Sequence, residues 1–168
     1  EQANGQSYAV GVTLGGGHTD SFHSEDSGDF GYLQGSFGTI LPLKVIAPQT
    51  ELRVELYGQL GTNKTPSSKL IGLGSEQFLR GYENGTFVGE TGARGSVEVA
   101  HSFYFQREIA NQVTPLAFID FGAVRNDASN STNISRPKSD VLVSAGLGLR
   151  ANIGYGANAE GFVGFPLM

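Results

Sequence analysis

Apolar and polar residues alternate along most of this chain. In residues 51–61 the large side chains of one face are leucine and valine only. The opposite face carries charged, aromatic and amide side chains: Glu51, Arg53, Glu55, Tyr57 and Gln59. A period of two is that of a β-strand, because successive side chains of a strand point to opposite faces. The pattern therefore predicts a half-buried strand whose second face is polar.

The same alternation recurs from end to end and predicts an all-β chain of about seven strands, with no segment of convincing helical period. The expected strands cover residues 7–14, 30–43, 51–61, 96–105, 116–124, 141–150 and 157–167. In the fifth, Asp120 lies on the polar face, and in the fourth, Glu98 does.

The connections between these strands alternate in length. Residues 47–50 and 153–156 are expected to be short turns, and 107–111 is intermediate. Long polar stretches are expected at 15–29, 62–90 and 125–140. Short turns at one end and long loops at the other, with strands of about ten residues, are typical of an antiparallel transmembrane β-barrel of an outer membrane. A soluble β-sandwich also has alternating strands and remains an alternative. Charges in mid-strand on one face only, at Glu55, Glu98 and Asp120, favour the barrel.

Seven strands cannot close a barrel of their own in lipid, because two sheet edges would be left unpaired. Either an eighth strand escapes the pattern or the chain is part of a larger barrel. On the second reading we expect that the 168 residues do not fold alone.

The composition excludes several kinds of binding site and partner. The chain has 25 glycines and no cysteine, which excludes disulfides and cysteine-ligated metal within it. The net charge of −5 argues against nucleic acid as a partner. No apolar run is long enough for a transmembrane helix, and no signal-peptide pattern stands at the N-terminus. The histidines, His18, His23 and His101, have no metal-ligand spacing and no nucleophile beside them, so we expect no metal, no cofactor and no enzymatic activity.

Three motifs stand in the same order along the chain. The first is a loop containing Ser75-Glu76-Gln77-Phe78-Leu79-Arg80-Gly81-Tyr82, followed by Gly89-Glu90-Thr91-Gly92 and by Glu98. The second is F-x-D-x-G, at Phe118-Ile119-Asp120-Phe121-Gly122. The third is the alternating run from Leu142 to Arg150, LVSAGLGLR. Order and spacing resemble those of the outer-membrane transporters of two-partner secretion, the TpsB family that includes FhaC and ShlB, a branch of the BamA-like barrel superfamily. The resemblance covers residues 52–167.

The resemblance implies a sixteen-stranded barrel preceded by two periplasmic POTRA domains. Residues 1–168 would be the C-terminal part of that barrel, without the POTRA domains and the closing strand, and the segment at about 62–92 would enter the lumen. The chain departs from the family pattern at Leu79, where valine is usual, and lacks the Gly-Gly that usually precedes the Arg-Gly-Tyr motif.

The resemblance also implies a pairing between two motifs. Arg80 of the loop, followed by Gly81 and Tyr82, would bind Asp120 of the strand that carries Phe118 and Gly122. An arginine is suited to this role because its planar guanidinium can bind both oxygens of a carboxylate. Glu55, Glu98 and Arg150 are expected to be lumen-facing charges rather than a catalytic pair.

The function implied is translocation of an unfolded exoprotein across the bacterial outer membrane without nucleotide, with the exoprotein and outer-membrane lipid as partners. One alternative within the superfamily is a barrel that inserts other outer-membrane proteins. An alternative of another class is a small soluble or eight-stranded β-barrel that binds a ligand.

Overall fold

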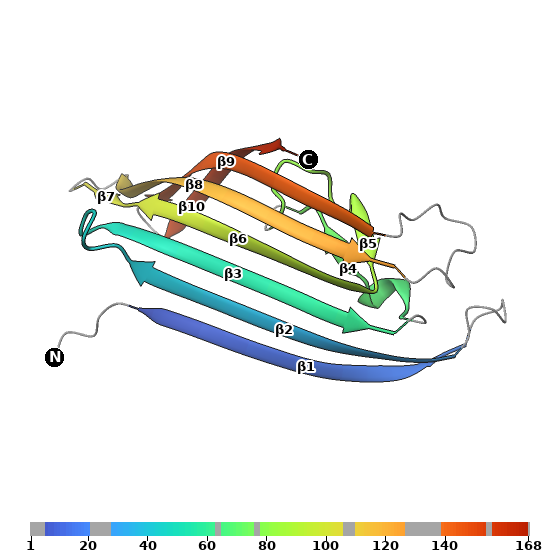
Figure 1. Ribbon diagram of the computed structural model, residues 1–168. Helices are drawn as coiled ribbons and strands as arrows, with labels where there is room; N and C mark the ends of the chain where they lie inside the picture. Colours follow the sequence, from blue (N-terminus) through green and yellow to red (C-terminus); the bar gives the residue numbers. More distant parts are fainter. Residues whose placement is uncertain are drawn as a thin grey trace.

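The computed structural model describes residues 6–20, 28–62, 65–75, 78–105, 110–126, 139–153 and 156–167. In this part of the chain the seven expected strands form one antiparallel sheet, in the order β1-β2-β3-β6-β8-β9-β10 (Figure 1). Their bounds are β1 Ser7–Thr19, β2 Gly28–Pro42, β3 Thr50–Gly61, β6 Thr91–His101, β8 Ala110–Arg125, β9 Ser139–Ile153 and β10 Ala157–Pro166. The short β7 (Phe103–Tyr104) also pairs with β8, just after β6 ends. The all-β antiparallel fold class is confirmed.

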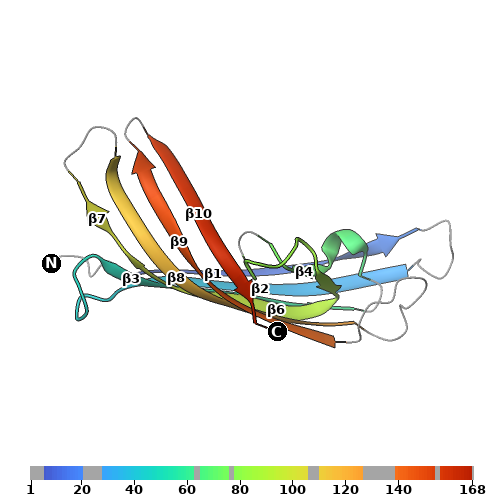
Figure 2. The same cartoon turned by 90° about the horizontal axis from the view of Figure 1, so that it is seen from above.

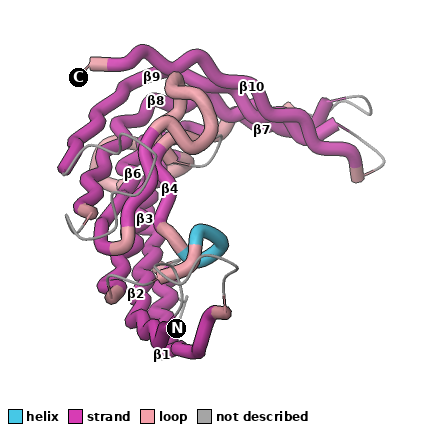
Figure 3. Tube along the Cα trace, turned by 90° about the vertical axis from the view of Figure 1, so that its right-hand side faces the viewer, coloured by secondary structure: helices cyan, strands magenta, loops and turns pink. Residues whose placement is uncertain are grey.

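Each long strand pairs with the next long strand along the chain, so the sheet is a simple meander. Its two edges within the described residues are β1 and β10, and the sheet is curved but not closed (Figure 3). No helix among the described residues is long and apolar enough to span a membrane.

Burial alternates along β8 as the sequence predicts. Asp120 is completely buried, whereas its neighbour Ile119 on the other face is 54 % exposed. Across the sheet, Ile119 continues an apolar row formed by Val54, Val97 and Ala145, which are paired in register on neighbouring strands. Within the described residues no second layer covers this outward face, which distinguishes the fold from the sandwich alternative.

The core lies on the other, concave face, where the segment between β3 and β6 folds back over the sheet (Figure 2). This segment contains a 3-10 turn, η2 (Ser67–Lys69), and a small two-stranded sheet of β4 (Ile71–Leu73) and β5 (Phe87–Gly89). The expectation of a long polar loop at 62–90 is therefore incomplete, because this segment contains two short strands. β4 and β5 pair with each other and are too short to show a period of two.

Several strand ends extend beyond the predicted bounds. Gly15 to Thr19 continue β1 and pair with β2, although we expected a loop from residue 15 to 29. The strand expected at 116–124 begins at Ala110, and the strand expected at 141–150 covers Ser139–Ile153. The reason is that backbone hydrogen bonds continue the ladder through glycine and polar residues, where side-chain alternation gives no signal.

Candidate functional site

The segment from β3 to β6 is tied to the sheet at both of its ends by one side chain. Gln59 of β3 donates from Nε2 to the carbonyl oxygen of Lys69 at 2.7 Å and to that of Glu90 at 3.1 Å. Its Oε1 accepts a hydrogen bond of 2.9 Å from Gln34 Nε2. Because residues 69 and 90 flank the β4–β5 pair, Gln59 holds the entering and the leaving parts of the segment against the same strand.

The described residues between β4 and β5, 74–75 and 78–86, are called the inner loop. Leu79 of this loop and Leu73 at the end of β4 are both completely buried and cluster with Val124 and Leu142 of the sheet. Gly122 leaves the room for this packing, because a Cβ added there would lie 2.8 Å from Leu73 Cδ2 and 2.9 Å from Leu79 Cδ1. The glycine of the F-x-D-x-G motif therefore lies directly under the inner loop.

The structure brings Arg80 and Asp120 together. The guanidinium donates from Nε to Asp120 Oδ2 and from Nη2 to Oδ1, both at 2.9 Å, and the backbone amide of Arg80 adds a third bond of 2.9 Å to Oδ2. Ser96 of β6 lies between them: its hydroxyl donates to Asp120 Oδ1 at 2.7 Å and accepts from Arg80 Nη2 at 3.0 Å. Each oxygen of the Asp120 carboxylate thus accepts a hydrogen bond from a different nitrogen of the Arg80 guanidinium, Nε or Nη2.

The Arg80 side chain is only 5 % exposed, and burial alone would lower the pKa of its guanidinium. The hydrogen bonds and charges of Asp120 and then Glu98 outweigh burial and raise this pKa above its ordinary value. The face of the group stacks on Phe118, with Cζ 3.5 Å from the ring centroid. Arg80 is therefore held as a cation whose edge meets carboxylates and whose face meets an aromatic ring.

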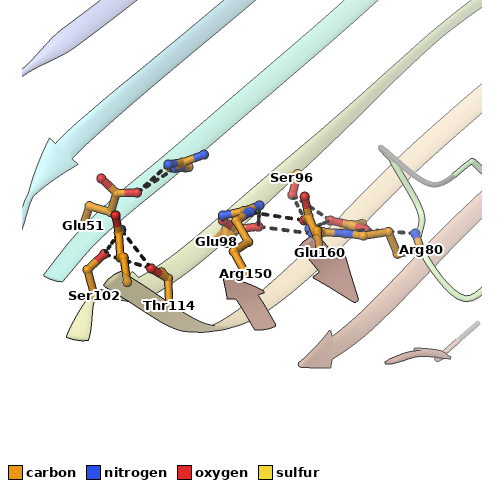
Figure 4. Close-up of polar contacts among 11 residues, drawn as sticks. Glu51, Arg80, Ser96, Glu98, Ser102, Thr114, Arg150 and Glu160 are labelled. Atoms are coloured by element: carbon orange, nitrogen blue, oxygen red, sulfur yellow. Dashed lines mark hydrogen bonds and ion pairs between the residues drawn. The ribbon is translucent and has the colours of Figure 1, made fainter. Parts of the chain in front are cut away.

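The ion pairs continue beyond this contact along the wall (Figure 4). Arg80 Nη1 donates to Glu98 Oε2 at 3.1 Å, and Glu98 also accepts two hydrogen bonds from Arg150 of β9, that from Nη2 being 3.0 Å long. Arg150 Nε then donates to Glu160 of β10 at 3.1 Å. Cations and anions alternate through these five side chains, which come from the inner loop and from β6, β8, β9 and β10.

Gly81 and Tyr82 fit the inner loop to the last strands. Gly81 has φ 101°, and a Cβ there would lie 2.7 Å from the carbonyl carbon of Gly164 in β10. The backbone therefore needs glycine both for its conformation and for this close approach. The Tyr82 hydroxyl donates to the carbonyl oxygen of Val143 in β9 at 3.0 Å.

A polar pocket of about 510 Å³ lies beside the ion pairs. Arg80, Glu98, Arg150 and Glu160 line it, and so do Arg53 and the exposed Glu55. Glu55 thus faces the same space as Glu98 and Arg150, but no hydrogen bond or ion pair joins it to that network. Within the described ranges, no group of three histidine, aspartate or glutamate side chains could hold a metal ion.

The sequence reasoning placed the main partners and missed several residues that support them. It did not single out Gln59, Ser96 or Gly164 as site residues. Their inward positions were visible in the alternation, but their partners lie far away in the chain or in the backbone, where no pattern marks them. Glu76 and Gln77 of the first motif lie outside the described residues.

Comparison with known families decides the relationship. The family described as "Haemolysin secretion/activation protein ShlB/FhaC/HecB" matches residues 4–151. The chain belongs to this family. Proteins of the ShlB/FhaC/HecB family are outer-membrane transporters of two-partner secretion, so the chain is assigned to the bacterial outer membrane. No curated protein and no solved structure matches the chain.

Proposed function

We propose that this chain forms part of an outer-membrane pore through which an unfolded exoprotein crosses without nucleotide. The apolar outward face would contact lipid, and the concave face with its charged side chains would line the pore. The observation that carries the proposal is the Arg80–Asp120 contact, which fixes the inner loop on the polar face of the sheet. The two open sheet edges support a larger barrel, whose remaining strands would pair with β1 and β10.

In this proposal the inner loop occupies the pore at rest. The bonds of Arg80 to Asp120, Ser96 and Glu98 would have to rearrange for an extended polypeptide to pass along the wall. Removing one partner of an ion pair this buried, without compensation, costs about 3–5 kcal/mol, so variants at Arg80 or Asp120 should disturb the resting position. Folding of the exoprotein outside the cell would draw transport forward. No catalytic group is proposed in the chain.

Secretion of the partner exoprotein by the full-length transporter tests this function. Arg80→Gln and Asp120→Asn should each reduce the exoprotein in the medium at least tenfold. The amount of folded barrel in the outer membrane, measured by heat-modifiable migration in gels, should stay nearly unchanged. Arg125→Gln is the matched control, since Arg125 lies at the end of β8, exposed, and takes no part in these contacts. Wild-type secretion by both Arg80→Gln and Asp120→Asn would refute the proposal.

A further inference from the structure

We propose that Arg94 is a second arginine anchor for the segment between β3 and β6, a positioning residue that fixes β4 and the start of the inner loop while Arg80 fixes the middle of the loop and Gln59 fixes the two ends of the segment. The effect on secretion rests on the proposed function, whereas the position of the segment can be measured independently of it.

The contacts of Arg94 reach the wall and the inserted segment at once. Its guanidinium lies between two rings, with Cζ 5.0 Å from the centroid of Tyr57 in β3 and 4.6 Å from that of Phe78 in the inner loop. Nη1 donates to the carbonyl oxygen of Gly72 in β4 at 3.0 Å. One side chain of the wall therefore contacts the segment at two points, the Gly72 carbonyl and the face of the Phe78 ring.

This environment suits an arginine and no smaller cation. Its planar group can stack on both rings while its edge still donates a hydrogen bond, which the ammonium group of lysine cannot do. The Nε atom of Arg94 is buried without a hydrogen-bond partner, so the two rings and the Gly72 carbonyl set the orientation of the group.

Arg94 belongs to the same row of inward side chains as the partners of Arg80. Arg94, Ser96 and Glu98 alternate along β6, and the latter two bind Arg80. The two anchors have opposite arrangements. At the first, the cation is on the loop and the carboxylates are on the wall. At the second, the cation and the Tyr57 ring are on the wall, and the Phe78 ring and the Gly72 carbonyl are on the segment.

Because of this difference, the two anchors should respond differently when another group competes for the carboxylates. The first anchor depends on Asp120 and Glu98, so a passing polypeptide that competes for these carboxylates would release Arg80. The second anchor, Arg94, is held by two aromatic rings and a hydrogen bond to a backbone carbonyl, and none of these contacts involves a carboxylate. Arg94 would therefore keep β4 and Phe78 on the wall while residues 79–86 move, and it would act as the fixed point of that motion.

Amide hydrogen exchange in the full-length transporter separates the two anchors. Residues 71–74 report on the β4 end, which Arg94 contacts, and residues 79–82 report on the part that Arg80 holds. Residues 69 and 90 are held by Gln59 and are left out of the readout. Arg94→Gln and Arg94→Lys should speed exchange at residues 71–74. Asp120→Asn should speed it at residues 79–82 and leave residues 71–74 protected as in wild type.

Phe78→Leu keeps an apolar side chain and an intact wall, and it should speed exchange at residues 71–74 even if Arg94 variants fold poorly. Arg125→Gln should change neither region. Exchange at residues 71–74 identical to wild type in folded Arg94→Gln, or in Phe78→Leu, overturns the inference. Normal secretion by Arg80 and Asp120 variants would instead count against the proposed function, and exchange at residues 71–74 would still decide on Arg94.

Discussion

Each inward residue of the F-x-D-x-G motif has a separate physical task. Phe118 supports the face of the Arg80 guanidinium, Asp120 binds its edge, and Gly122 leaves space for two leucines under the inner loop. The spacing of two follows from the strand, since only alternate residues reach the concave face. The inward residues of the motif therefore form, on a single strand, a surface that binds the inner loop.

Removing the charge of Arg80 should loosen the inner loop more than neutralising Asp120. Arg80→Gln leaves a completely buried carboxylate with little compensation, at a cost of about 3–5 kcal/mol of docking free energy. Asp120→Asn leaves Arg80 its bond to Glu98 and should cost less. Amide hydrogen exchange of residues 78–82 measures both. Equal protection in Arg80→Gln and wild type would contradict the argument.

Gly81→Ala should displace the inner loop from β10. The added Cβ meets the Gly164 backbone at 2.7 Å, and φ 101° is unfavourable for any residue with a side chain. Gly85→Ala is a sharp control, because Gly85 also has positive φ, at 68°, but open space around it. We expect reduced secretion and faster exchange at residues 78–82 for Gly81→Ala and a much smaller effect for Gly85→Ala. Equal effects would show that crowding against Gly164 is unimportant.

At the scale of elements, the strands were predictable and the inserted segment was not. Alternation of apolar and polar side chains located β3 within one residue and the later part of β8, and it assigned the faces of both strands, but it missed the start of β8 at Ala110. The three-residue strands β4 and β5 carry no period, and their placement depends on Gln59 and on a leucine cluster assembled from distant parts of the chain. The Arg80–Asp120 contact was expected from the motif resemblance alone, because 40 residues separate the two and no local pattern joins them.

The two faces of the sheet should respond differently to a change of charge, as Ile119 of β8 and Glu55 of β3 can show. Ile119→Lys puts an ammonium group on the outward face in mid-strand, where lipid contact makes it cost about 2–4 kcal/mol. Glu55→Lys changes the charge on the concave face, beside the polar pocket, and should leave insertion nearly unaffected. The folded fraction in lipid vesicles, measured by heat-modifiable migration, distinguishes them. Normal folding of Ile119→Lys would contradict the assignment of the faces.

At the scale of the whole molecule, a curved sheet with one apolar and one charged face holds its own inserted segment against the charged face (Figure 3). Five alternating charges link that segment to four strands, so its position depends on the curvature of the wall as well as on one ion pair. In a closed barrel such a segment would narrow the pore, and releasing it would widen the path.

Ion conductance of the full-length transporter in a planar lipid bilayer tests this account most directly. With the inner loop held by Arg80, wild-type protein should pass a small current, and Asp120→Asn should raise the average current because the loop leaves the wall more often. Arg125→Gln should behave as wild type. A current for Asp120→Asn that is indistinguishable from wild type, with the barrel correctly inserted, would contradict the claim that this contact keeps the loop in the pore.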